Sequence, residues 1–164
     1  MKKLFVCLSA LLLCYAANAQ LKVTIKCPEF QVDILKGYVN HQLLPTSTNR
    51  EIIHLFPCAT HVDSVGTSAK CGAAVYYKDK DISFYTDRDY IEIGPNFKGK
   101  LSLPLMHSAR NSLFKCLGAP QVKEATWDAF QTQYGLLILY YNKANRVDKI
   151  QFSTQNAGNI RLCQ

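Results

Sequence analysis

The sequence lacks the local motifs of several large enzyme classes. It contains no glycine-rich phosphate-binding loop, no Gly-x-Ser-x-Gly turn of the serine hydrolases and no His-Glu-x-x-His zinc motif. Low-complexity tracts and long flexible linkers are also missing. These absences argue against nucleotide-dependent chemistry and the commonest hydrolase folds, and they predict one domain rather than several tethered modules.

No apolar run is long enough to cross a bilayer. Residues 1–3 are basic at two positions, residues 4–15 form an apolar run, and Ala17-Asn18-Ala19 supplies an A-x-A cleavage motif. The order predicts a Sec signal peptide over residues 1–19, cleaved after Ala19, because a membrane-spanning helix needs ~20 apolar residues. Acylation at Cys14 is not expected, since Leu13 stands where a small residue is needed. We therefore expect residues 20–164 in the periplasm or secreted.

A concentrated positive stripe is missing as well. The full chain has a formal net charge of +7, and loss of Lys2 and Lys3 leaves 17 basic against 12 acidic residues, a net charge of +5. Basic and acidic residues alternate in Lys78-Asp79-Lys80-Asp81 and in Asp87-Arg88-Asp89, as is typical of solvated turns. Such a surface does not follow a phosphate backbone, so we expect no nucleic-acid partner.

What the sequence does contain is a pattern that occurs twice. The longer copy, at 108–154, has a short helix, a linker with the only tryptophan and two strands, and a shorter copy begins at residue 47. Their offsets of 61, 64 and 68 residues fit small loop insertions, so we predict a tandem duplication with repeats at about 28–93 and 94–164. The matching landmarks are Ser47 with Ser108, Tyr76-Tyr77 with Tyr140-Tyr141, and Ile82-Ser83-Phe84 with Ile150-Gln151-Phe152.

Each predicted helix has one apolar side. At 47–56 either Ser47 or Thr48 is the expected N-cap, and Glu51 follows Thr48 at the capping-box spacing. At 108–117 Ser108 is the expected N-cap, and Arg110 lies on the polar side, where Arg110→Ala should cost little stability. The apolar stripe of this second helix consists of Ala109, Leu113, Cys116 and Leu117.

Alternating polar and apolar residues predict the strands. Residues 147–154 place Ile150 and Phe152 on one face and Lys149 and Gln151 on the other, the pattern of a strand with one wet face. We therefore expect an α+β fold, residues 20–164, in which two helices pack on one face of a largely antiparallel sheet and the other face stays open. The other predicted strands are 21–26, 30–35, 75–78, 82–86, 90–93, 101–105 and the more central 136–141.

Five of the seven cysteines follow the predicted signal peptide. Cysteines in an oxidising compartment usually form disulfides, and Cys58 with Cys71, which flank the loop after the first helix, is the expected pair. Cys27 with Cys163 is the candidate second disulfide, and Cys116 with Cys163 competes with it. On the apolar stripe, Cys116 is otherwise expected as a buried thiol, and the odd number also allows an intermolecular bridge.

Two kinds of chemistry remain as alternatives. One is a zinc site, but the spacing of its candidate ligands is loose and exported cysteines are usually oxidised, so we expect no metal and no cofactor. The other is a nucleophile–base pair of Cys58 or Cys116 with His107, which has no local signature, so we expect no enzyme. The zinc-type side chains are His54, Cys58, His61 and Cys71.

Tyrosines are concentrated in the predicted strands. Because neighbouring strand residues point to opposite faces, each Tyr-Tyr pair places one ring in the core and one outward. We expect a protein-binding surface on the open face, because aromatic rings with a polar rim are typical of such surfaces. The alternative is that these tyrosines simply favour strands. The candidate binding residues are Tyr85, Tyr76, Tyr141, Lys149 and Gln151.

A signal peptide, a repeated helix with antiparallel strands, a bridged loop after the first helix and aromatics on an open sheet face together resemble the β-lactamase-inhibitor-protein family. The segment Leu113–Pro120, followed by Trp127 and strands at Leu136 and Val147, is also similar to the SmpA/OmlA family of small outer-membrane lipoproteins, whose repeat is related in architecture. The chain departs from the first family in lacking a clear second bridged loop, and from the second in lacking a lipobox cysteine.

The resemblance implies a fold and a binding role. It implies an exported, non-enzymatic, inhibitor- or immunity-like protein whose partner is another protein. The alternatives are an envelope-assembly or structural accessory protein, and then a small hydrolase or zinc protein.

Overall fold

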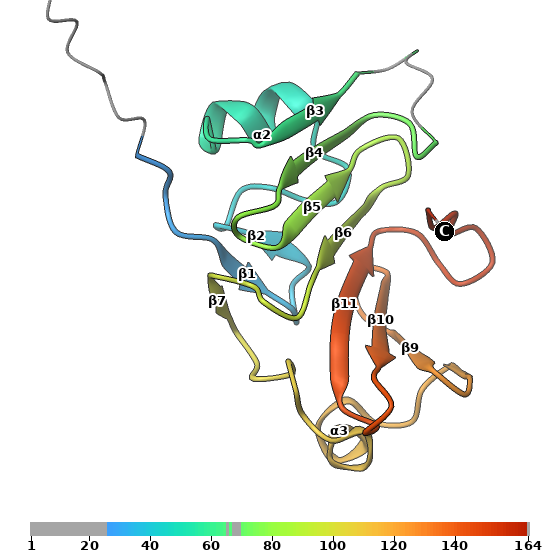
Figure 1. The fold of residues 1–164 in the computed structure, drawn as a ribbon. Helices are drawn as coiled ribbons and strands as arrows, with labels where there is room; N and C mark the ends of the chain where they lie inside the picture. The colour runs from blue at the N-terminus through green and yellow to red at the C-terminus, as the bar shows by residue number, and fades with distance from the viewer. Residues whose placement is uncertain (1–25, 65, 67–69, 164) are drawn as a thin grey trace, which may run out of the picture.

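A computed structural model describes residues 26–64, 66 and 70–163 (Figure 1). The predicted signal peptide lies outside these residues, as does nearly all of the strand expected at 21–26. Within the described part of the chain, no helix is long and apolar enough to span a membrane.

An eight-stranded sheet dominates the fold and is antiparallel throughout. Its strand order is β3-β4-β5-β6-β11-β10-β9-β8, so β6 and β11 pair at the centre and each half is a four-stranded meander. The strands of the first half are β3 (His61–Asp63), β4 (Ala74–Tyr77), β5 (Ile82–Tyr85) and β6 (Tyr90–Ile93). Those of the second half are β8 (Val122–Lys123), β9 (Trp127–Gln131), β10 (Leu136–Tyr141) and β11 (Val147–Ser153).

A small second sheet is formed mainly by the N-terminal part of the described chain. In it β1 (Gln31–Asp33) pairs antiparallel with β2 (Tyr38–Val39) and parallel with β7 (Lys100–Leu101). Phe30, Val32 and Ile34 from this region are almost fully buried and belong to the main core.

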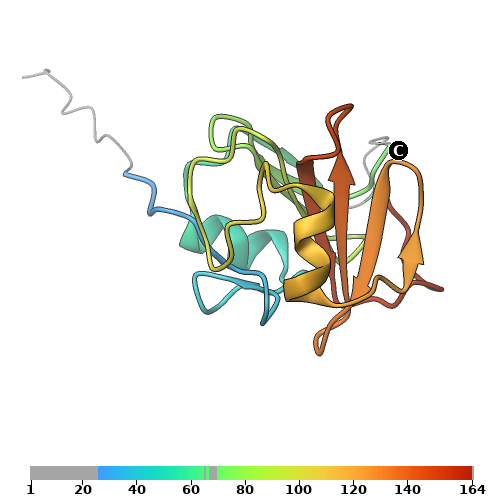
Figure 2. The same cartoon turned by 90° about the horizontal axis from the view of Figure 1, so that it is seen from below.

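One face of the large sheet, here called the inner face, carries the main core. The small sheet and two helices, α2 (Asn49–Leu55) and α3 (Arg110–Leu117), contribute side chains to it. Figure 1 shows α2 near β3 and β4 and α3 at the opposite end of the sheet, and Figure 2 shows α3 beside β10 and β11. The inner-face residues are Val75, Tyr77, Ile82, Phe84, Ile91, Ile93, Phe130, Leu137, Leu139, Tyr141, Ile150 and Phe152.

The predicted α+β class is therefore wrong, because the described chain is mostly β, with eleven strands in two sheets and two short helices. The helices have seven and eight residues, about two turns each, so they cover only part of the inner face. The small sheet and its loops cover much of the rest. Sequence patterning also missed β2, β3, β8 and β9 as strands.

Of the two predicted helix N-caps, the one for α2 is confirmed and the one for α3 is wrong. Thr48 caps α2 in a complete capping box with Glu51, as its spacing predicts. Ser108 does not cap α3, because its hydroxyl donates to the Pro104 carbonyl and the N-cap position is Ala109. The start of α3 is instead fixed by backbone contacts to the β10–β11 turn, where the Arg110 N–H donates to the Asn145 carbonyl.

Arg110 lies in a buried network, which contradicts the expectation that it faces solvent. Its Nε and Nη2 donate to the two carboxylate oxygens of Asp128, at 2.9 and 2.5 Å, and Asp128 is fully buried. The Tyr141 hydroxyl donates to the same carboxylate at 2.8 Å, and the guanidinium carbon lies 4.7 Å from the centre of the Tyr141 ring. The remaining guanidinium donors bind the carbonyls of Glu124 and Ala125.

The tandem duplication stays a prediction. Each half of the large sheet follows one helix and contains four strands. Counted outwards from the central pair, however, β4 corresponds to β9, whereas the sequence landmarks match β4 with β10. Phe56 is fully buried in the first half, while Leu117 is only partly buried in the second.

Candidate functional site

The opposite face of the large sheet, the outer face, carries a continuous row of side chains across all eight strands. Directly paired residues of antiparallel strands point to the same side, so the pairings that begin at His61 and Tyr76 define this row. The row reads His61, Tyr76, Ser83, Glu92, Gln151, Ile138, Ala129 and Val122. A second row places Lys149, Tyr140 and Trp127 side by side.

A C-terminal tail, residues 154–163, covers the apolar half of the outer face. Ala157, Ile160 and Leu162 of the tail pack around a small buried cluster. That cluster consists of Ala129, Leu136 and Ile138 on β9 and β10. The tail therefore acts for this half of the sheet as the helices do for the inner face, by removing apolar side chains from water.

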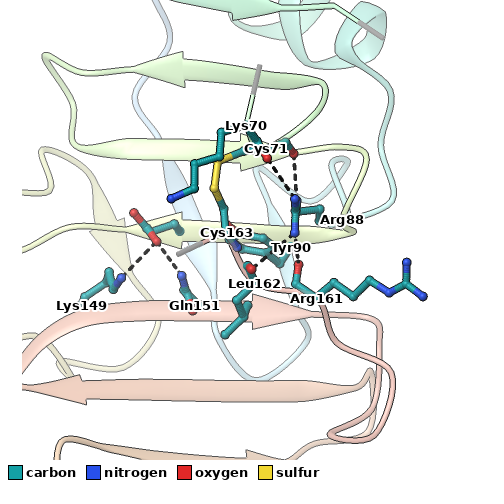
Figure 3. The surroundings of a disulfide bond; sticks show 10 residues. Lys70, Cys71, Arg88, Tyr90, Lys149, Gln151, Arg161, Leu162 and Cys163 are labelled. Carbon is teal, nitrogen blue, oxygen red and sulfur yellow. Dashed lines mark hydrogen bonds and ion pairs between the residues drawn. A yellow bond between two sulfur atoms is a disulfide. The ribbon is translucent and has the colours of Figure 1, made fainter. Parts of the chain in front are cut away.

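Three attachments hold the tail in place (Figure 3). A disulfide joins Cys71 to Cys163, and the Cys163 N–H donates to the Tyr90 hydroxyl at 3.2 Å. Arg88 donates from Nε to the Cys71 carbonyl at 2.9 Å and from Nη2 to the Lys70 carbonyl at 3.2 Å. Its Nη1 donates to the carbonyls of Arg161 and Leu162 at 3.3 and 3.4 Å, so one guanidinium joins both sides of the disulfide.

The disulfide pairing differs from the predicted one. Cys58 is bonded to Cys27, with Cα atoms 5.6 Å apart, and Cys71 to Cys163, with Cα atoms 5.4 Å apart. The predicted pairs Cys58–Cys71 and Cys27–Cys163 are therefore both wrong. Proximity in sequence misled the prediction, because β3 and the following loop separate Cys58 from Cys71, while the tail brings Cys163 across the sheet.

The free cysteine also differs from expectation. Cys116 is unpaired among the described cysteines and is exposed rather than buried, because the core side of α3 is formed by Leu113 with partial burial of Phe114 and Leu117. The zinc alternative loses its ligands, since Cys58 and Cys71 belong to two different disulfides. No group of three or more potential metal ligands converges within the described residues.

The tail leaves part of the outer face accessible, here called the outer patch: Tyr76, Ser83, Tyr85, Glu92, Tyr140 and Lys149, all partly exposed. Its aromatic rings form ordered contacts. Tyr76 and Tyr85 meet edge to face with ring centres 5.8 Å apart, and Tyr85 stacks on buried Tyr90 at 4.4 Å. His61 stacks on the far side of Tyr76 at 5.7 Å. These rings are held by strands and by each other.

Glu92 lies at the centre of the outer patch. Its Oε2 accepts from the Gln151 amide at 2.5 Å and forms an ion pair with the Lys149 ammonium at 3.3 Å. The same ammonium lies 4.3 Å from the centre of the Tyr140 ring. A carboxylate, an ammonium and an aromatic ring thus form one contact group at the surface (Figure 3 shows the Lys149 and Gln151 contacts).

The patch tyrosines are neutral at physiological pH, and their surroundings raise each pKa further above it. Burial raises the pKa of Tyr85 to about 12, and the nearby Glu92 and Tyr76 add to the effect. Burial also raises the pKa of Tyr76, together with a hydrogen bond to Asp63 and the negative charges of Asp63 and Glu92. The phenol groups therefore act as neutral hydrogen-bonding groups, which fits recognition better than proton transfer near pH 7.

The structure brings together some of the residues that the sequence selected. Tyr76, Tyr85 and Lys149 lie on the accessible outer patch. Tyr141 does not, because it points to the inner face and binds Asp128, and its neighbour Tyr140 takes the outward position. Gln151 is on the outer face but almost fully buried. Glu92 was not among the predicted site residues. It joins the outer patch because β6 pairs with β11, and alternation within one strand does not show which strands pair.

Comparison with known proteins adds no relative: no family model, curated protein or solved structure matches the chain. The two disulfides, with no membrane-spanning helix in the described residues, are compatible with an extracellular or periplasmic location.

Proposed function

We propose that this protein is an exported, non-enzymatic binding protein that docks a protein partner on the outer patch. The observation that carries the proposal is the set of three partly exposed tyrosines, Tyr76 and Tyr85 on the adjacent strands β4 and β5 and Tyr140 on β10, on the part of the outer face that the tail leaves accessible. Large aromatic side chains with a polar group at one end are the residues that contribute most to protein interfaces.

The rigidity of the patch supports the same proposal. Ring contacts at 5.8 and 4.4 Å hold Tyr85 between Tyr76 and Tyr90, so little side-chain entropy is lost when a partner covers it. Glu92 and Lys149 add polar groups beside the rings, the composition of a specific rather than a purely apolar surface. An inhibitor- or immunity-like role is the form of this function that we favour, in which the partner is an enzyme whose activity falls on binding.

Alanine at position 85 tests the proposal. A photo-crosslinking residue at position 76 of the oxidised protein is used to identify the partner in a periplasmic or culture extract, and calorimetry then measures its affinity for each variant. Tyr85→Ala is expected to weaken binding by ~2 kcal/mol or more, because central aromatic anchors concentrate interface energy. Circular dichroism checks that the variant is folded.

Two variants serve as controls. Tyr38→Ala removes a partly exposed tyrosine from the small sheet, and Lys115→Ala removes an exposed charge from α3, both away from the outer face. Both should bind as the unmodified protein does. If folded Tyr85→Ala binds normally, or if either control loses affinity to the same extent, the binding site is elsewhere and the proposal is wrong.

A further inference from the structure

The outer patch already binds one cation, which belongs to the protein itself. The Lys149 ammonium lies between the Glu92 carboxylate, at 3.3 Å, and the centre of the Tyr140 ring, at 4.3 Å. A carboxylate neutralises the charge and a tyrosine ring attracts it through its electron-rich face. A carboxylate beside a tyrosine ring therefore holds a cation on this side of Glu92.

The other side of Glu92 offers similar groups without a cation. Both described donors to Glu92, from Lys149 and Gln151, use Oε2, and no described residue donates to Oε1. The Ser83 side chain, directly opposite Glu92 in the β5–β6 pairing, also has no hydrogen-bond partner among the described residues. Two acceptors without donors therefore lie side by side on a partly exposed surface.

Tyrosine rings border these two acceptors. Tyr76 is paired directly with Ser83 across β4 and β5, and Tyr85 lies two residues from Ser83 on the same strand and face. Cross-strand neighbours of this kind lie about 5 to 8 Å apart, within reach of one long side chain from a partner. Asp63, beside Tyr76, adds a second negative charge at the edge.

We propose that the partner places an arginine side chain here, with its guanidinium on the free Glu92 oxygen and Ser83 and its plane against Tyr85 or Tyr76. A guanidinium suits these groups better than an ammonium does, because its planar fork can donate to two acceptors and stack on an aromatic ring at once. This inference rests on the proposed function, since it names the chemistry that the outer patch recognises.

The site is tested first without the partner. The probe is N-acetyl-arginine methylamide, titrated into isotope-labelled oxidised protein and followed by amide chemical shifts. Saturable shifts are expected at Ser83, Tyr85 and Glu92, and the uncharged analogue with citrulline in place of arginine should produce none. Glu92→Gln should weaken binding about tenfold or more, because it removes the charge of the acceptor.

Matched variants separate the site from general surface charge. Glu29→Gln removes another glutamate that forms a surface ion pair, with Lys100 at 2.8 Å, outside the patch, and should leave the titration unchanged. Lys149→Met removes the competing cation and should tighten binding. Equal shifts in Glu92→Gln and the unmodified protein, or shifts spread over many acidic residues, would overturn the inference.

The identified partner distinguishes this inference from the proposed function. If Glu92→Gln weakens the complex about tenfold or more and an arginine of the partner is equally needed, the inference holds. If Tyr85→Ala loses the partner while Glu92→Gln binds normally, the outer patch is the interface but arginine is not its ligand. If folded Tyr85→Ala binds the partner normally, the proposed function itself fails.

Discussion

At the scale of single residues, the contact between Arg110 and Asp128 shows how strongly one unpredicted pair can fix a fold. The carboxylate of Asp128 is fully buried and accepts from both Arg110 and Tyr141. Removing the arginine leaves a buried negative charge without its cation, which costs much more than the pair contributes. Arg110 thus ties α3 to β9 and β10.

Arg110→Ala is accordingly expected to destabilise the protein by roughly 3 to 5 kcal/mol, measured by chemical denaturation. The control is Arg146→Ala, which removes an exposed arginine whose Nη1 donates to the His107 carbonyl, and this variant should lose less than about 1 kcal/mol. Similar small losses in both variants would show that Asp128 is not held by Arg110.

The tyrosines predict a loss of stability at alkaline pH. The pKa of Tyr85 is raised from 10.0 to about 12, so the folded protein keeps a proton that the unfolded chain releases. The stability that this shift contributes is fully present below pH 10 and is lost as the pH rises through about 12. Unfolding free energies measured across this range should therefore fall, and Tyr85→Phe should fall less steeply. A pH-independent stability, or identical slopes, would contradict the shifted pKa.

At the scale of secondary structure, predictions from local sequence were correct where the interacting residues are close together in the sequence. The Thr48–Glu51 capping box lies within four residues, and the alternation in β11 separates Ile150 and Phe152 from Lys149 without help from the fold. The prediction that Arg110 faces solvent failed because its partner, Asp128, is on β9, a strand that sequence patterning missed. The Trp127–Gln131 segment buries Asp128 between apolar neighbours. No local pattern marks an aspartate whose charge is neutralised from another element.

The tail is the element that sequence patterning missed most completely. Residues 154–163 contain no regular strand or helix, so periodicity cannot locate them. Their position depends on Arg88 and on Cys71, which lie more than 70 residues earlier in the chain. The tail covers apolar residues of β9 and β10, so the accessible part of the outer face is smaller than alternation alone predicts.

Removing the tail disulfide should both destabilise the protein and loosen the tail from the sheet. The Cys71→Ser, Cys163→Ser double variant opens a loop of 92 residues, for which the chain-entropy model gives a loss of about 4 to 5 kcal/mol. In this variant, amide hydrogen exchange should accelerate at position 163 and its neighbours while β10 and β11 stay protected. The matched control, Cys27→Ser with Cys58→Ser, should leave the tail protected. Tail protection that is unchanged in the first variant would contradict its anchoring role.

At the scale of the whole molecule, alternation predicted a largely antiparallel sheet but not the two elements that help to cover it, the small sheet on the inner face and the tail on half of the outer face. The helices were expected to form a complete layer, whereas the small sheet supplies Phe30, Val32 and Ile34 to the same core. Short strands such as β1, with three residues, carry too little periodicity to reveal that role. The general position of the candidate surface follows from alternation, whereas its boundary depends on long-range contacts.

The cysteine pairing can be checked on the intact protein. Thiol titration of residues 20–164 in the native state should find one reactive thiol per chain, because Cys116 is exposed and the other four described cysteines are paired. Cys116→Ser should remove the signal, and non-reducing peptide mapping should return Cys27 with Cys58 and Cys71 with Cys163. Recovery of a Cys58–Cys71 peptide from folded, homogeneous protein would contradict this arrangement.

The second disulfide joins cysteines that lie far apart in the sequence, and this affects how the protein matures. Cys58 and Cys71 are 13 residues apart, closer along the chain than either native pair, at separations of 31 and 92. In a chain that emerges N-terminus first, Cys27 and Cys58 can pair before Cys71 follows; once Cys71 is present, however, the shorter loop between Cys58 and Cys71 closes at a lower entropic cost than either native loop. The neighbouring pair is thus the non-native bond that we expect to compete with the two native ones. Such a bond is resolved when the Cys27 thiolate attacks Cys58 and releases Cys71, or when the Cys163 thiolate attacks Cys71 and releases Cys58, so any chain that forms it must isomerise a bond that the finished protein does not contain.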